Sequence, residues 1–162
     1  MNKIRDIFLT IIFISIFLMI YIYYNDIQFK NNPLSDDVKL KLTKKEHYIR
    51  NLIIQKYGFD LKIPIIISDK IPDNLYGLAA YNEGEIKIVL NKNRFKESED
   101  YMIDYVLPHE YAHAMMFKLK QFPKQNGGHT KQWQNICISL EGKKCDRFVN
   151  HNDIVMGKLN FL

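Results

Sequence analysis

The chain opens with a run of apolar residues that leaves no polar face. Residues 7–24 read IFLTIIFISIFLMIYIYY, without a charge, a proline or a glycine. A helix rises about 1.5 Å per residue, so this run just crosses a hydrocarbon core of about 30 Å. Tyr21, Tyr23 and Tyr24 stand at its end, where aromatic residues favour the membrane interface. The pattern predicts one uncleaved transmembrane helix over residues 7–24, preceded by a short flank over residues 1–6.

A cleaved signal peptide is the main alternative to this anchor. Lys3 and Arg5 would form its basic amino-terminal region. However, the apolar run is longer than a usual signal core, and the bulky residues after it do not resemble a small-residue cleavage site. A buried helix of a soluble protein is the third reading, but it would normally keep a polar face.

The charges around the span do not decide its orientation. Lys3 and Arg5 precede it, while Lys30 and Lys39 follow within about fifteen residues. A long domain can be translocated regardless of its own charge. We expect a single-pass membrane protein with a cytoplasmic amino end and the remaining domain outside.

After a polar linker over residues 25–33, a single domain is expected over residues 34–162. A helix capped by Ser35 or Asp36 and ended by Gly58 is predicted from apolar residues at roughly helical spacing. These residues are Leu40, Leu42, Tyr48, Ile49, Leu52 and Ile53.

Three short strands follow in the pattern. The β-branched run 63–68 predicts the first, and residues 78–81 and 85–90 predict two more around a turn at residues 82–84. In the last, apolar and polar side chains alternate, which is typical of a half-buried strand. We expected its edge to be exposed and to hold an extended substrate through main-chain hydrogen bonds.

The carboxy-terminal half returns to helical spacing. One helix is predicted over about residues 98–121, with Pro108 kinking or restarting it. A loop over residues 122–128 leads to a further helix over about residues 129–140, which would pack Trp133 into the core. The order of elements predicts a small α+β domain.

Composition adds little to this picture. The 162 residues are 47% hydrophobic and 25% charged, as in ordinary globular proteins, and the net charge is +5. Residues 1–24 contribute +1 of it, which leaves +4 spread along the domain. Such a spread favours a solvated surface over a nucleic-acid-binding face, although nucleic acid is not excluded as a partner.

The two cysteines leave two interpretations open. Cys137 and Cys145 lie eight positions apart, so no CxxC motif supports a zinc ribbon or a redox dithiol. They would pair as a disulfide in an oxidising compartment if the chain turned back at Gly142. Two partly buried thiols fit the sequence equally well.

The strongest chemical signal is the sequence His109-Glu110-Tyr111-Ala112-His113. Residues four apart share a helix face, so both imidazoles reach one metal ion, and imidazole is a good zinc ligand. Glu110 need not bind metal. It lies beside the first ligand and is placed to accept a proton from water as the catalytic base.

A catalytic zinc ion needs three protein ligands and one open position. His129 is the best third candidate, because Gly127 and Gly128 before it allow the chain to reverse and approach closely. The expected cofactor is therefore Zn²⁺, held by His109, His113 and His129. His47 and His151 are expected at the surface.

Three segments together resemble the SprT-like metallopeptidases, relatives of Spartan. The run 106–114, VLPHEYAHA, is similar to their HExxH helix with its preceding proline, and residues 128–133, GHTKQW, are similar to their Gly-His-Gly-Lys-Glu-Trp element. Residues 77–81 and 86–91 are similar to their paired strands. The resemblance implies a small zincin-like (minimal gluzincin) domain with a short antiparallel sheet, and a zinc metallopeptidase acting on a protein or peptide substrate.

The chain departs from the family pattern in three ways. Thr130 replaces the usual glycine, no carboxy-terminal zinc ribbon follows, and a membrane segment is unusual for a family known for action at DNA. Two other functions therefore remain open beside a membrane-anchored peptidase. They are action on DNA-associated proteins and a non-catalytic domain stabilised by zinc.

Overall fold

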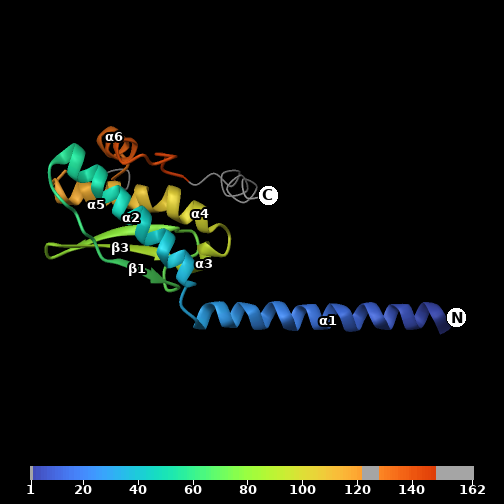
Figure 1. The fold of residues 1–162 in the computed structure, drawn as a ribbon. Helices are drawn as coiled ribbons and strands as arrows, with labels where there is room; N and C mark the ends of the chain where they lie inside the picture. Colours follow the sequence, from blue (N-terminus) through green and yellow to red (C-terminus); the bar gives the residue numbers. More distant parts are fainter. Residues whose placement is uncertain (1, 122–127, 149–162) are drawn as a thin grey trace. The chain divides into compact units, whose positions relative to one another are not determined.

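The computed structural model describes residues 2–121 and 128–148, and the chain forms two compact units, residues 1–35 and 36–162 (Figure 1). The first unit is one helix, α1 (Asn2–Asn31), which is long and apolar enough to cross a membrane by its length and composition. It continues through most of the stretch expected as a linker. Lys30 pairs with Asp26 at 2.9 Å one turn away, and the first helix breaker, Pro33, comes after its end.

The second unit begins with α2 (Asp36–Tyr57), whose bounds agree with the helix predicted from spacing. Gly58 ends it with a positive φ of 77°, as expected for a glycine after a helix. Ile49 and Ile53 are fully buried, whereas Leu40 and Tyr48 of the predicted apolar face are exposed.

The sheet contains three strands, β1 (Ile65–Ser68), β2 (Gly77–Asn82) and β3 (Glu85–Asn91), in the order β1-β3-β2. The expectation of an antiparallel sheet was wrong for one of its two pairs, because β1 runs parallel to β3. The chain reverses between β1 and β2 and again in the β2–β3 hairpin, so β3 recovers the direction of β1. Local turn signals predict the hairpin but not this pairing of distant strands.

The expected exposed edge at residues 85–90 was also wrong. Strand β3 is central and pairs on both sides, with Ile88 and Leu90 fully buried. The strand that forms an edge near the HExxH helix is β2, because α5 (Leu107–Lys118), which contains that motif, packs over β2 and β3.

The single helix predicted over residues 98–121 is interrupted. Two short turns, α3 (Lys92–Phe95) and α4 (Glu99–Tyr101), lead into a π-helical turn, η1 (Met102–Val106), before α5 begins. Pro108 lies in the first turn of α5 and has no backbone N–H, so a regular helix would lose a hydrogen bond at this residue. The π-helical turn η1 comes directly before this point. The prediction that Pro108 restarts the helix agrees with this geometry.

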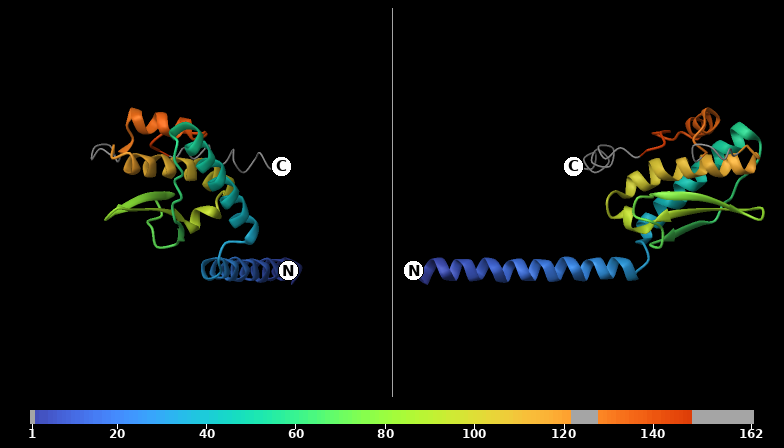
Figure 2. Two further views of the ribbon diagram at one scale, coloured as in Figure 1. Left: turned by 60° about the vertical axis from the view of Figure 1, so that its left-hand side comes forward. Right: turned by 180° about the vertical axis from the view of Figure 1, so that it is seen from behind.

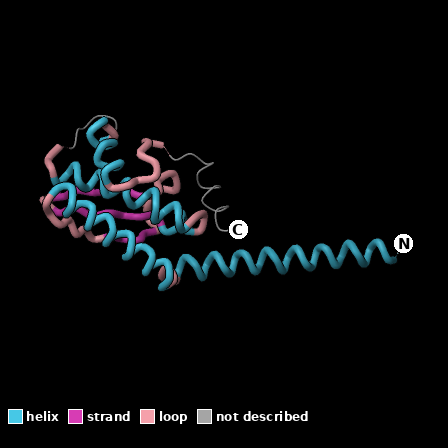
Figure 3. The backbone as a smooth tube through the Cα atoms, turned by 45° about the horizontal axis from the view of Figure 1, so that its top comes forward, coloured by secondary structure: helices cyan, strands magenta, loops and turns pink. Residues whose placement is uncertain are grey.

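The last helix, α6 (Lys131–Ser139), packs on α5, so that α5 lies between the sheet and α6 (Figure 2). Figure 3 shows the same arrangement, with the three strands gathered beneath the helices. Leu107, Met115 and Met116 of α5 are fully buried in this sandwich. Helix α5 therefore has a packed layer on each side, which fixes the direction of its side chains.

A disulfide joins Cys137 in α6 to Cys145, so the first of the two interpretations of the cysteines holds in the structure. Gly142 stands at the turn between them. A Cβ at this position would lie 2.7 Å from Cys137 Sγ, closer than real Cβ contacts, and 3.1 Å from Cys145 Sγ, which is also tight. The close approach of the chain to the disulfide therefore requires glycine here.

Candidate metal centre

Three histidines from two segments converge at one point beside α5. His109 and His113 lie one turn apart on α5, and His129 comes from the segment just before α6. Their Nε2 atoms are 3.2 Å (His109 to His113), 3.1 Å (His113 to His129) and 3.0 Å (His129 to His109) apart. The structure thus brings together all three residues that the sequence suggested as ligands.

The spacing of the three Nε2 atoms suits a cation with tetrahedral coordination. Zinc–nitrogen bonds of about 2.0–2.1 Å at tetrahedral angles separate two nitrogens by about 3.3 Å. A neutral imidazole carries one N–H, so three Nε2 atoms this close cannot all be satisfied by hydrogen bonds among themselves, whereas one cation accepts all three lone pairs. The three side chains could therefore hold a metal ion, and an all-imidazole set is consistent with zinc.

Burial keeps the histidines in the form that binds metal. Burial, with a smaller contribution from the neighbouring His129, lowers the pKa of His109 from 6.5 to about 3. Burial likewise lowers the pKa of His113 to about 3, with smaller contributions from the other two histidines. Both imidazoles are therefore neutral at pH 7, with lone pairs available to a cation.

Glu110 lies beside the first histidine and is 5% exposed. Burial raises the pKa of its carboxyl from 4.5 to about 8, and a hydrogen bond donated by the backbone N–H of Ala79 opposes that rise. A divalent cation nearby would favour the charged form and lower the pKa again. The carboxyl therefore gains or loses its proton near neutral pH.

Strand β2 comes unusually close to this carboxyl. A Cβ on Gly77 would lie 3.0 Å from Glu110 Cγ and 3.1 Å from Glu110 Oε1. The fully buried Asn91 holds the start of the strand, because its amide donates to the backbone oxygens of Leu75 (2.8 Å) and Pro72 (3.3 Å). Glycine at position 77 therefore allows β2 to cover the base.

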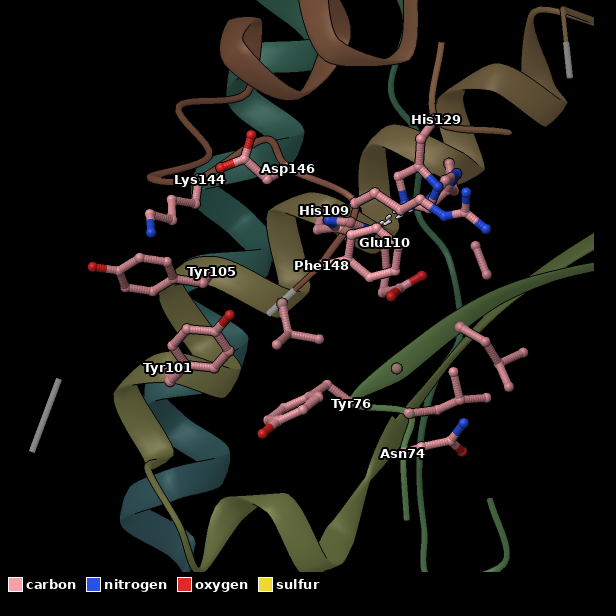
Figure 4. A pocket seen from close by; sticks show the side chains of 17 residues that line it. Asn74, Tyr76, Tyr101, Tyr105, His109, Glu110, His129, Lys144, Asp146 and Phe148 are labelled. Carbon is pink, nitrogen blue, oxygen red and sulfur yellow. Dashed lines mark hydrogen bonds between the residues drawn. The ribbon is translucent and has the colours of Figure 1, made fainter. Parts of the chain in front are cut away.

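A cleft of about 740 Å³ opens onto the metal centre. Its lining joins the three histidines and Glu110 to residues 74–79 before and within β2, to the tyrosines at positions 101 and 105, and to residues 144 and 146–148 on either side of Cys145. Figure 4 shows the Glu110 carboxylate on the side of the imidazoles that faces β2. A volume of this size is typical of ligand-binding clefts.

The model of the SprT-like family matches residues 53–151, which is more than half of the chain. The chain belongs to the SprT-like family. Neither a curated protein nor a solved structure matched the chain in the other two comparisons. The family resemblance seen in the sequence is thereby confirmed, and the three histidines and Glu110 all lie within the matched range.

Thr130, which departs from the family pattern, has a clear structural use in this SprT-like chain. Its backbone is extended, and its side chain accepts a hydrogen bond from the backbone N–H of Trp133 at 3.3 Å. Threonine is a good residue for this position at the start of a helix. Helix α6 therefore begins at Lys131, and His129 lies two residues before it instead of at its first position.

Trp133 does more than fill the core. Its ring centroid lies 4.6 Å from those of His109 and His129, and 5.1 Å from that of His113, on which it stacks. It is 1% exposed. One indole therefore contacts all three candidate ligands and restricts their rings to the converging geometry.

Two further histidines, His47 and His151, are expected at the surface. His47 is exposed, as expected, and His151 lies outside the described residues. Tyr81 of β2 stacks on Phe117 with ring centroids 5.5 Å apart and does not line the cleft.

Sequence reasoning missed Gly77, Asn91 and the tyrosines of the cleft. Each depends on contacts between segments far apart in sequence. No local pattern would have identified them.

We predict that Trp133 is needed for tight metal binding. Trp133→Ala should weaken zinc affinity by about 10- to 100-fold, as outer contacts to ligands commonly do, whereas Trp133→Phe should retain most of it. Affinity is measured by competition with a chromophoric chelator, using the full-length chain in detergent. Phe117→Ala, which removes an α5 ring stacked on Tyr81, is the matched control. Equal affinities for the alanine variant and the parent would contradict the role.

The raised pKa of Glu110 predicts a pH-dependent cost in the metal-free protein. The folded state keeps a proton that the unfolded state releases, so stability falls as pH rises from about 4.5 to about 8. Glu110→Gln should therefore raise the free energy of unfolding by an amount on the order of a few kcal/mol at pH 8 and by little at pH 4.

Urea denaturation of full-length protein at both pH values, with chelator present, measures this difference. Glu83→Gln, which alters an exposed turn residue, is the control. A stabilisation that is largest at acidic pH would have the wrong sign for this explanation.

Proposed function

We propose that this protein is a membrane-anchored zinc metallopeptidase with a zincin-like (minimal gluzincin) catalytic domain. The observation that carries the proposal is the convergence of three imidazole Nε2 atoms, 3.0–3.2 Å apart, beside a buried carboxyl on the same helix. Its membership of the SprT-like family supports the same chemistry. His109, His113 and His129 would hold the zinc ion, and Glu110 would be the catalytic base.

The chain's own residues then have distinct roles in hydrolysis. When bound, zinc supplies Lewis-acid chemistry, which polarises a peptide carbonyl and lowers the pKa of a water molecule. The Glu110 carboxylate accepts a proton from the attacking water and delivers it to the leaving amine. The N–H of Ala79 steadies the charged form of that carboxylate, and the close cover of Gly77 limits access of bulk water.

An extended substrate fits along β2 better than along β3. The N–H of Asn91 donates to the carbonyl of Tyr76 across the β2–β3 ladder, so the even-numbered residues from 76 to 82 bond to β3. The main-chain groups of Gly77 and Ala79 therefore point away from β3, toward the side where Glu110 lies. A peptide running beside this edge would pass the metal centre.

The anchor is α1, and we propose that the catalytic domain lies on the oxidising side of the membrane. Disulfides persist outside the cytoplasm and are rare within it, and the domain contains the Cys137–Cys145 bond. A domain on that side would act on proteins near the bilayer. Action on DNA-associated proteins would instead require a cytoplasmic domain with free thiols.

Peptidase activity is tested with full-length, zinc-loaded protein in detergent and a fluorogenic protein substrate. Glu110→Gln should lower kcat/KM by at least about 100-fold while zinc content stays unchanged, because it removes the base but no ligand. Glu83→Gln should keep full activity. If the Glu110→Gln variant is as active as the parent, Glu110 is not the catalytic base, and the remaining interpretation is a metal ion that only stabilises the domain. Cleavage that requires added DNA would favour the DNA-associated role.

Topology is tested in intact cells with reporters fused after Asn31. Alkaline phosphatase should be active and green fluorescent protein dark, because the fusion point lies on the translocated side. Cys137 and Cys145 of the native chain should react with an alkylating reagent only after reduction. The opposite reporter pattern together with free thiols would place the domain in the cytoplasm.

A further inference from the structure

One wall of the cleft beside the metal centre is made of stacked tyrosines. The ring of Tyr101 stacks on that of Tyr105 with centroids 4.8 Å apart, and it meets the edge of Tyr76 at 5.7 Å. All three line the cleft that also contains Glu110. The hydroxyl of Tyr76 donates to Glu97, so this polar group is already bonded within the protein. We call these three residues the tyrosine wall.

Residues 144–148, which follow the turn at Gly142, contribute the opposite side of the same cleft. Lys144, Asp146, Arg147 and Phe148 of this segment, here called the cleft roof, line the cleft. Figure 4 shows Lys144 and Asp146 across the cleft from Tyr76, with Phe148 between them and the metal centre. Phe148 is 77% exposed, which is unusual for a large apolar ring next to a catalytic centre.

Two attachments hold the roof in position. The disulfide ties Cys145 to α6, the helix that also carries Trp133. Lys143 pairs with Asp104 at 2.7 Å, and its ammonium lies over the ring of Tyr105 at 5.4 Å. The roof is thus attached on one side to the helix behind the histidines and, through the adjacent Lys143, on the other side to the π-helical turn that carries Tyr105.

We propose that the tyrosine wall and the cleft roof form a side-chain subsite for an aromatic or large aliphatic residue next to the scissile bond. The proposal rests on the proposed peptidase function and names its substrate preference. Aromatic rings gain from stacking and edge contacts in addition to the burial of area, and both wall and roof offer such contacts. The disulfide is then a positioning device, because it holds one side of the subsite.

The charges of the roof make an acidic side chain the main competing occupant, because Lys144 and Arg147 outnumber Asp146. The Arg147 guanidinium lies over the ring of Phe148 at 5.1 Å, and Asp146 stands between Lys144 and Arg147 with the opposite charge. The tyrosine wall itself presents ring surface. The alternative preference, for aspartate, is an outcome that the same experiment detects.

The test uses full-length, zinc-loaded protein in detergent and quenched peptides that differ only on either side of the scissile bond. Peptides with phenylalanine or leucine there should give kcat/KM at least about tenfold above those with alanine, aspartate or lysine. Tyr105→Ala should reduce the phenylalanine-to-alanine ratio toward one. Tyr48→Ala, which alters an exposed tyrosine of α2 outside the cleft, should leave the ratio unchanged.

The role of the disulfide is tested with the double substitution Cys137→Ala and Cys145→Ala. Its phenylalanine-to-alanine ratio should fall by about fivefold or more while its zinc affinity stays within about threefold of the parent, because the ligands lie outside the roof. If the double variant loses zinc, reduction of the native bond with a phosphine replaces it. A ratio unchanged by loss of the bond would overturn the positioning role.

Binding separates failure of the subsite from failure of the peptidase. Phenylalanine hydroxamate and alanine hydroxamate share one metal-binding group, and Trp133, the single tryptophan of the chain, reports their binding to zinc-loaded Glu110→Gln protein through its fluorescence. The phenylalanine compound should bind at least about tenfold more tightly, and Tyr105→Ala should remove that advantage. Equal affinities would overturn the subsite even if peptides are cleaved. A tenfold difference without any peptide cleavage would keep the subsite and reject the peptidase.

Discussion

The candidate centre depends on the packing of α6 against α5. His109 and His113 share a face of α5 by helical geometry alone, but the third imidazole arrives only because the chain returns and docks α6 on the same helix. Trp133 connects this helix packing to the histidines, because its ring contacts all three of them. Docking places an indole behind imidazoles whose nitrogens lie 3.0–3.2 Å apart, and it thereby sets the geometry available to a cation.

Burial has opposite effects on the two kinds of group in this site. It lowers the pKa of His109 and His113 to about 3, which keeps them neutral and able to bind metal, and it raises the pKa of Glu110 to about 8. The metal-free protein therefore keeps a carboxyl in an environment that disfavours its charge. A bound cation would offset the desolvation cost of the charged Glu110 carboxylate. The neutral imidazoles would bind the same cation through their lone pairs. Metal binding would therefore favour ionisation of Glu110, because the cation and the carboxylate share one buried site.

Much of the fold followed from local patterns in the sequence. The spacing of α2, the apolar run of α1 and the turn at residues 82–84 each depend on neighbouring residues. Helix α2 and the turn formed where they were expected, and α1 formed over its apolar run but continues to Asn31, through most of the expected linker. The errors concerned pairing over distance. Strand β3 was expected to be an edge but is central, and β1 joins it in parallel, because only the complete chain determines which strands meet. The approach of Gly77 to Glu110 and the edge contact between Tyr76 and Tyr101 were not predicted, for the same reason.

The disulfide links three properties that the sequence presents separately. It needs oxidised thiols, as in the compartment that we propose for the domain. It also lies between α6, which supports the metal centre through Trp133, and residues 144–148, which line the cleft. A short crosslink of this kind constrains a segment that has no helix or strand of its own. The bond thereby fixes one wall of the cleft beside the candidate centre, and it can do so only where thiols are oxidised.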